Sequence, residues 1–129
     1  MPFILDTSAV LALLFREPGQ DAVQAALREG AAMSAVNFSE TISRLVRDGM
    51  ATDSAATALS ALPIALHDFD TELAVLAGGM LGQTRLLGLS LGDRACLALA
   101  RREALPALTG DHAWLQAGKL VDVDVRLIR

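Results

Sequence analysis

Four acidic residues lie where short apolar segments of the chain meet the starts of helices. Asp6 and Asp111 each follow a predicted strand, and Glu40 and Asp93 are expected in the first turn of predicted helices. In a parallel α/β sheet, ligands bind beyond the carboxyl ends of the strands, so the four side chains are expected to converge at that edge. Oxygen ligands without imidazole or thiolate suit a hard cation such as Mg²⁺ or Mn²⁺. The spacing therefore predicts a carboxylate metal site.

Each acid also has a purely structural explanation. Glu40 stands three residues after Asn37, which is the spacing of a capping box. Asp93 would be favourable near the positive end of a helix dipole, whereas Asp6 and Asp111 can serve as turn residues. Four carboxylates at one edge repel one another, however, so their convergence requires a cation or arginine side chains to offset the charge.

Arginine supplies almost all of the positive charge, because Lys119 is the only lysine beside ten arginines. Arg44 and Arg47 are expected on the same helix face as Glu40, and Arg94 directly follows Asp93. Two interpretations stay open for these arginines. They form either a solvated face with a weak ion pair or a surface that contacts RNA phosphate or a protein partner beside the acidic site, since the guanidinium group matches phosphate geometry.

The hydrophobic pattern predicts short strands that alternate with helices. Strands are expected over residues 3–5, 31–36, 64–66, 106–109 and 121–127. Helices are expected over residues 9–15, 19–28, 37–48, 52–61 and 70–81, and from Ser90 onward. Asn37 is predicted to cap the third of these helices, and Gly82 to end the one that Asp70 caps. This alternation is typical of an α/β fold with a parallel sheet and helices on both faces.

Length and composition limit the class of protein. The 129 residues predict one domain over 1–129, with 53% hydrophobic and 20% charged residues, which excludes a disordered chain. We expect no membrane span and no secretory signal, and the single cysteine, Cys96, is typical of a reducing cytoplasm. GxxxxGK[ST] and GxGxxG motifs are absent from the sequence, which disfavours nucleotide-binding versions of this fold.

The net charge of −4 excludes a basic protein that coats nucleic acid nonspecifically. Apart from the four candidate ligands, 11 acidic residues balance 11 Lys and Arg. The excess negative charge can therefore belong to a metal-centred site, and an acidic total does not by itself exclude RNA as substrate.

Four segments in this order resemble a PIN-domain ribonuclease and are most similar to the VapC-type toxins of type II toxin–antitoxin pairs. They are residues 3–9 (FILDTSA), 39–40 (SE), 89–95 (LSLGDRA) and 107–114 (ALTGDHAW). The resemblance spans the whole chain. It implies a three-layer sandwich whose five-stranded parallel sheet has the order 3-2-1-4-5.

The resemblance also implies a Mg²⁺- or Mn²⁺-dependent endoribonuclease. The acidic positions of the family, with catalytic and metal-binding roles, correspond to Asp6, Glu40, Asp93 and Asp111. Thr109 matches a hydroxyl position that supports the first aspartate, and Ser8 is expected to line the site. We expect Asp6 and Asp93 to be the principal direct ligands, Asp111 to bind directly or through water, and Glu40 to orient or deprotonate the nucleophile.

The implied partners are an RNA substrate, a second copy of the chain in a homodimer, and a cognate antitoxin in a hetero-oligomer. Two alternatives are a noncatalytic PIN-like binding module and another Mg²⁺-dependent phosphoesterase. A phosphatase of the haloacid-dehalogenase type is disfavoured, because it needs a second aspartate where Ser8 stands.

Overall fold

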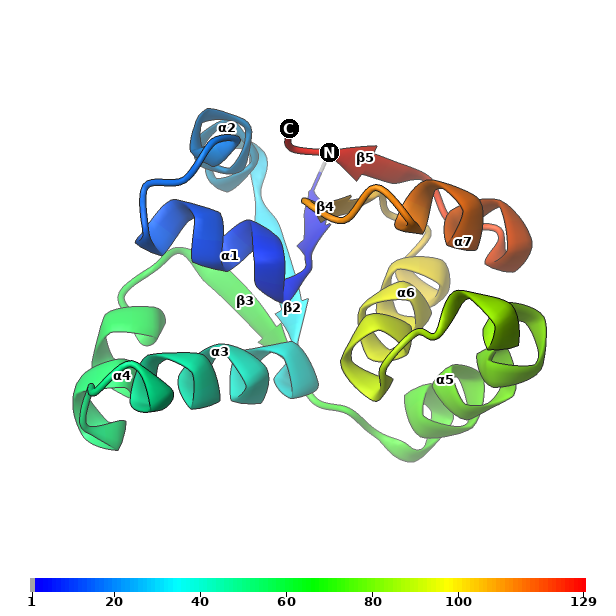
Figure 1. Cartoon of the computed structure of the whole chain (residues 1–129), viewed down its shortest axis with the longest axis horizontal. Coiled ribbons are helices and arrows are strands. Elements are labelled where there is room, and N and C mark those ends of the chain that lie inside the picture. Colours follow the sequence, from blue (N-terminus) through cyan, green and yellow to red (C-terminus); the bar gives the residue numbers. More distant parts are fainter. Residues whose placement is uncertain (1) are drawn as a thin grey trace.

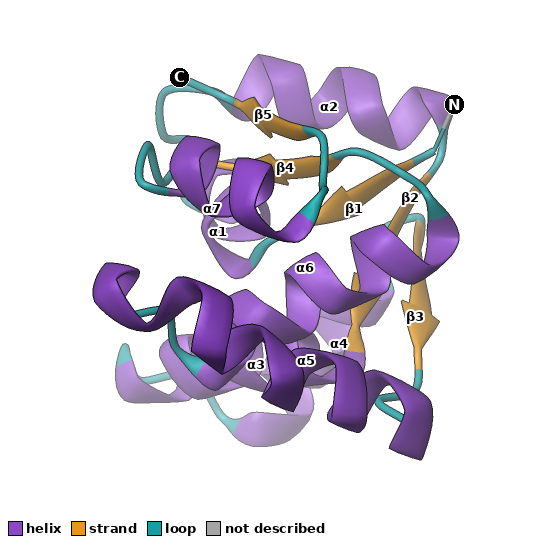
Figure 2. Cartoon of the chain, turned by 90° about the vertical axis from the view of Figure 1, so that its right-hand side faces the viewer, coloured by secondary structure: helices purple, strands orange, loops and turns teal. Residues whose placement is uncertain are grey.

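The computed structural model describes residues 2–129 and contains a five-stranded parallel sheet in the order β3-β2-β1-β4-β5. The sheet order and the α/β class predicted from the sequence are confirmed. The chain enters at the centre of the sheet and leaves at an edge, so β3 and β5 lie at opposite edges (Figure 2). The strands are β1 (Phe3–Leu5), β2 (Ala31–Ser34), β3 (Ile64–His67), β4 (Ala107–Thr109) and β5 (Val125–Leu127).

Helices cover both faces of the sheet (Figure 1). One layer contains α1 (Thr7–Leu14), α2 (Gln20–Glu29), α3 (Ala35–Arg47) and α4 (Thr52–Ser60). The opposite layer contains α5 (Thr71–Thr84), a short 3₁₀ turn (Arg85–Leu87), α6 (Leu91–Glu103) and α7 (Trp114–Val121). Within residues 2–129, none of these helices has the length and apolar character needed to cross a membrane.

Successive residues of the central strand point into two different cores. Ile4 packs with the buried faces of α5, α6 and α7, whereas Leu5 packs with those of α1 and α2. The helix predicted from Ser90 onward is α6, whose apolar residues from Ala95 to Ala100 are all buried, so it lies at the centre of this layer. Two well-packed layers thus fix β1 in place, and the first residue after it is Asp6.

Four details of the prediction are wrong. The third helix begins at Ala35 and not at Asn37, because the Ser34 hydroxyl accepts a hydrogen bond from Val36 N–H and caps it. The helical spacing of Phe38, Ile42, Leu45 and Val46 predicts that this helix buries all four, yet Val46 is exposed. Helix α5 continues through Gly82 to Thr84. At the end of the chain, the strand expected over 121–127 is shorter, because Val121 is the last residue of α7, a helix that was not predicted, and β5 begins only at Val125.

Candidate active site

The structure brings all four predicted acids to one cavity of about 330 Å³ beyond the carboxyl ends of β1 and β4. The cavity is lined by Asp6, Thr7, Ser8, Leu11, Glu40, Arg44, Asp93 and Asp111. Its walls come from α1, α3, α6 and the loop after β4. The topology therefore assembles residues more than 100 positions apart in the sequence.

Two hydroxyl groups hold Asp6, which is only 5% exposed. Ser8 Oγ and Thr109 Oγ1 each donate to Asp6 Oδ2 at 2.7 Å. The same hydroxyl oxygens accept hydrogen bonds from the backbone N–H groups of Gly110 at 2.9 Å and Asp111 at 3.0 Å. Because each hydroxyl has a single proton and gives it to Asp6, the orientation of the carboxylate is fixed from two elements.

Burial, with a smaller contribution from the charge of Asp93, raises the pKa of Asp6 to about 6. The hydrogen bonds from Ser8 and Thr109 act in the opposite direction but do not outweigh the loss of solvent. Asp6 is thus a carboxylate whose negative charge the protein alone leaves largely uncompensated.

Glu40 lies in the second turn of α3 and not in its first turn, since the helix begins earlier than predicted. Its Oε1 accepts hydrogen bonds from Thr7 Oγ1 at 2.7 Å and from Asn37 Nδ2 at 3.1 Å. Asn37 is therefore a partner of Glu40 inside the helix and not its cap. A Cβ atom at Gly92 would overlap the Glu40 carboxylate, so only glycine allows this approach of α6.

Asp93 caps α6 and also faces the other acids. Its Oδ2 accepts from Ser90 N–H at 2.9 Å, and Ser90 Oγ accepts from Asp93 N–H at 3.1 Å, which completes a capping box. Burial is the largest influence on its pKa and raises it. The Ser90 hydrogen bonds lower the pKa, and the charges of Glu40 and Asp111 raise it. Asp93 is thus electrostatically coupled to the other three acids.

Asp111 is exposed at the mouth of the cavity. Its Oδ1 accepts a hydrogen bond from Ala113 N–H at 3.0 Å, which forms a local turn before α7. Asp111 therefore forms the predicted turn and also lines the cavity.

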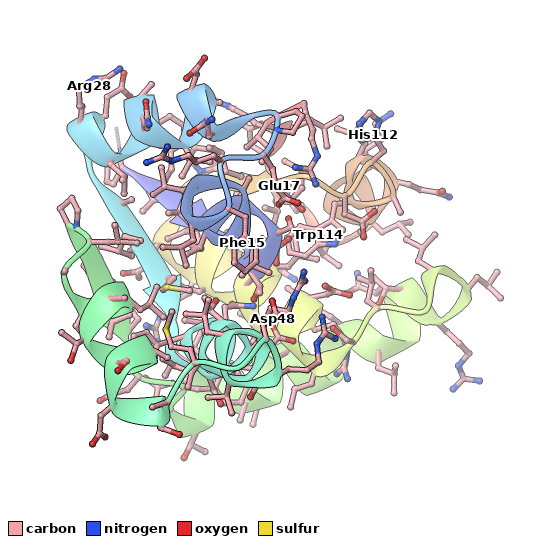
Figure 3. The ribbon with its side chains drawn as sticks, turned by 60° about the vertical axis from the view of Figure 1, so that its left-hand side comes forward. Phe15, Glu17, Arg28, Asp48, His112 and Trp114 are labelled. Carbon is pink, nitrogen blue, oxygen red and sulfur yellow. The ribbon has the colours of Figure 1, made fainter. Side chains whose placement is uncertain are left out.

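The arginines occupy different positions around this site. Arg44 lines the cavity, donates to Asp48 Oδ2 at 3.2 Å and lies over the Phe15 ring at 5.3 Å. Figure 3 shows Phe15 and Asp48 at the adjoining ends of α1 and α3. Arg47 has a side chain that is 70% exposed. The structure places Arg94 against α5, where its guanidinium donates to the Ala77 carbonyl at 3.0 Å and does not line the acidic cavity.

A larger groove of about 770 Å³ adjoins the acidic cavity. It lies between α3 and the start of α6, and Glu40 and Arg44 line both spaces. Hydroxyl groups and Arg47 contribute to its α3 wall, and Phe69 lies at its opposite side. The groove gives an extended molecule a path to the four acids.

The donor set fits a hard divalent cation. In each of the four side chains, the direct hydrogen bonds go to one carboxylate oxygen. Within residues 2–129, none of the four forms an ion pair with a basic side chain. In the same residues, no group of three or more acidic, His or Cys side chains lies so that it could hold one metal ion. The acids thus form an open group of oxygen donors that a cation would stabilise.

Sequence reasoning missed two residues at this site, Thr7 and Asn37. Thr7 was adjacent to a candidate acid, and Asn37 was assigned to capping because of its spacing from Glu40. The same three-residue spacing inside a helix places two side chains on one face, and this signal could have identified the contact.

The structure was compared with solved structures, and several bacterial toxin–antitoxin proteins share its fold. DNA-bound VapBC from Salmonella typhimurium matches with a TM-score of 0.76 and 13% identity, covering 100% of this chain and 99% of that chain. VapC20 of Mycobacterium tuberculosis, a sarcin–ricin loop cleaving toxin, matches with a TM-score of 0.76 and 20% identity over 90% and 95% of the two chains. FitAcB from Neisseria gonorrhoeae matches with a TM-score of 0.68 and 20% identity over 95% of each chain.

At the level of sequence, no curated protein matches the chain. The family model of the PIN domain, however, matches residues 3–120, which include all four acids and the hydroxyls that hold Asp6. The chain therefore belongs to the PIN domain family.

Proposed function

We propose that this protein is a metal-dependent endoribonuclease that acts as the toxin of a type II toxin–antitoxin pair. The observation that carries the proposal is the convergence of four uncompensated carboxylates on one cavity of a PIN domain. The toxin role is supported by structural neighbours that are VapBC and FitAB complexes and by a neighbour that cleaves the sarcin–ricin loop.

The proposed roles follow from burial and contacts. Asp6 and Asp93 would hold Mg²⁺ or Mn²⁺ directly, because both are partly or fully buried and mutually repulsive without a cation. Asp111, at the mouth, would bind directly or through water. A bound divalent cation supplies positive charge that offsets the scissile phosphate and lowers the pKa of water in the site. Glu40 orients that water and accepts its proton.

The groove beside the acids is the proposed path for RNA. Arg47 is exposed along it and Arg44 lies where it meets the acidic cavity, so both are positioned to contact phosphates. Arg94 is engaged with α5 and has the weakest case for such a role. The open groove suits single-stranded or looped RNA, whose bases are accessible for recognition.

The proposed setting is that of a VapC-type toxin. A cognate antitoxin would cover the site, and the protein would act in the cytoplasm as a homodimer or in a hetero-oligomer with the antitoxin. In this proposal residues 1–129 form the single nuclease domain.

The test uses purified protein freed of any partner, a panel of structured and single-stranded RNAs, and Mg²⁺ or Mn²⁺. Wild-type protein should cleave a subset of the panel. Asp6→Asn should lower the cleavage rate by more than the ~10–100-fold that is typical of substitutions outside the direct ligands. Asp53→Asn, which removes an exposed acid on α4, is the matched control and should cleave as wild type does.

Two outcomes would contradict the proposal. An absence of cleavage on the whole panel would favour a noncatalytic binding module. Equal cleavage by wild type and Asp6→Asn would show that the activity comes from another centre or from a contaminant.

A further inference from the structure

We propose that Thr7 and Asn37 are positioning residues that set the orientation of the Glu40 carboxylate. The inference rests on the proposed nuclease function and adds two residues that act through Glu40. The observation behind it is that side chains from α1 and α3, together with the backbone of α6, all meet at this one carboxylate.

The two donors are directed at the same oxygen atom. Thr7 Oγ1 donates to Glu40 Oε1 at 2.7 Å from the first turn of α1. Asn37 Nδ2 donates to the same atom at 3.1 Å from one turn earlier on α3. Hydrogen bonds to a charged acceptor are shorter and stronger than neutral ones, so two of them restrain a side chain that would otherwise rotate freely.

The orientation of the Asn37 amide follows from its neighbours. Its Nδ2 faces three oxygen acceptors: Glu40 Oε1, the Gly92 carbonyl at 3.0 Å and Thr7 Oγ1 at 3.4 Å. Only the amino end of the amide can donate to them, so the assignment of oxygen and nitrogen is determined. Among residues 2–129, the buried Oδ1 atom of Asn37 has no hydrogen-bond partner, which is unfavourable. Asn37 thus gives up a hydrogen bond of its own while it holds Glu40.

Gly92 closes the arrangement from the third side. A side chain at this position would overlap the Glu40 carboxylate, and the Gly92 carbonyl accepts from Asn37. The next residue on α6 is Asp93, whose pKa the charge of Glu40 raises. The same contacts that orient Glu40 therefore set its position relative to Asp93.

These contacts predict that loss of the Thr7 hydroxyl affects the catalytic rate more than it affects the stability of the fold. Misplacement of a reacting group by about 1 Å can lower a rate by ~100-fold. Loss of the Thr7 hydroxyl should lower kcat, because the water that Glu40 orients is displaced. The KM for RNA should change little, because Thr7 lies in the acidic cavity and does not line the groove.

The test compares Thr7→Val with Thr7→Ser in the partner-free protein. Thr7→Val keeps the shape of the side chain and should lower kcat about 10-fold or more, within the range seen for residues that orient catalytic groups. Thr7→Ser keeps the hydroxyl and should restore most of kcat. Thr41→Val is the control, because it removes a buried hydroxyl of α3 that donates to the Asn37 carbonyl and not to Glu40; its kcat should match wild type.

A double-mutant cycle with Glu40→Ala distinguishes positioning from general support of the fold. If Thr7 acts through Glu40, Thr7→Val should lower kcat and Tm much more in the wild-type background than in Glu40→Ala, where Thr7 keeps only its contacts with Asn37. Asn37→Ala should show the same coupling. The inference would be overturned if Thr7→Val had the same kcat as an active wild type. It would also be overturned if Thr7→Val lowered kcat and Tm as much in Glu40→Ala as in the wild-type background. A wild type that cleaves no RNA would instead reject the proposed function, while the Tm cycle would still report on the contact.

Discussion

At the scale of single residues, the same acidic side chain makes a local hydrogen bond and lines the cavity. Asp93 forms a capping box through Oδ2, and Asp111 forms a turn through Oδ1. Each of these local bonds occupies one oxygen and fixes the direction of the carboxylate. The structural explanations that the sequence left open are thus the means by which the backbone aims these side chains into the cavity.

The buried Asp6 should make the metal-free protein less stable as the pH rises through the acidic range. Its folded-state pKa of about 6 lies above the ordinary value of 3.8, so the folded protein binds more protons than the unfolded chain between these values. The free energy of unfolding should therefore fall by about 2 kcal/mol from pH 4 to pH 6 because of this group, and the loss should be complete by about pH 7.

Denaturant unfolding in EDTA at pH 4 to 7.5 measures this effect. Asp6→Asn removes the titrating group and should flatten the pH profile relative to wild type. The raised pKa of Asp93 acts in the same direction in both proteins, so the difference between their profiles reports the titration of Asp6 together with its coupling to Asp93. If the free energy of unfolding depended on pH in the same way in wild type and Asp6→Asn, the raised pKa of Asp6 would be contradicted.

At the scale of elements, the strands and the acids could be predicted from sequence because both depend on local patterns. The short apolar runs before Asp6 and Asp111 are strands, and the four carboxylates share one cavity because parallel strands end at one edge. The start of α3 could not be predicted in this way. Ser34 and Asn37 are both good caps, and only the tertiary contacts of Asn37 with Gly92 and Thr7 decide between them.

The end of the chain was mispredicted because its apolar pattern fits two structures. The alternation from Val121 onward indicates a strand, yet Val121 is buried as the last residue of α7. Gly118 lies inside that helix, where a Cβ would meet Val125 Cγ2 at 2.6 Å, so the glycine serves close packing of α7 on β5. Gly82 likewise lies within α5, and the turn with positive φ occurs later, at Gly88.

Ala104 is an element-scale site where one substitution should stabilise the fold. It ends α6 in the left-handed conformation, with φ of 54°, and it is exposed. This conformation is unfavourable by roughly 1–2 kcal/mol for a residue with a Cβ, and glycine avoids that penalty at the expense of a more flexible unfolded chain. We expect Ala104→Gly to raise the free energy of unfolding by about 0.5–1 kcal/mol.

Chemical denaturation measures this change, with Ala58→Gly as the matched control. Ala58 is also exposed but lies within α4, where glycine should lower stability by about 1 kcal/mol. Opposite signs for the two variants are expected. If both Ala104→Gly and Ala58→Gly lowered the free energy of unfolding, the left-handed conformation of Ala104 would not be a source of strain at the end of α6.

At the scale of the whole molecule, the charge distribution gives the net charge of −4 a structural meaning. Elsewhere on the described chain, acids such as Asp48, Asp70 and Asp124 pair with nearby arginines. The four acids at the cavity lack such pairs within residues 2–129 and face one another. These four acids thus share one cavity without a basic partner among residues 2–129, which favours binding of a cation there.

This concentration of charge predicts that a divalent cation stabilises the whole protein. A ligand that binds only the folded state at ten times its dissociation constant adds about 1.4 kcal/mol. For a chain of 129 residues, this corresponds to a rise in Tm of roughly 4 °C. We expect that rise in Tm for wild-type protein in MgCl₂, compared with NaCl of equal ionic strength.

Asp93→Asn should abolish this rise in Tm, because Asp93 couples to the other three acids. Asp53→Asn, an exposed acid outside the cavity, should retain the full shift. A shift that is equal in all three proteins would place the stabilising cation away from this site.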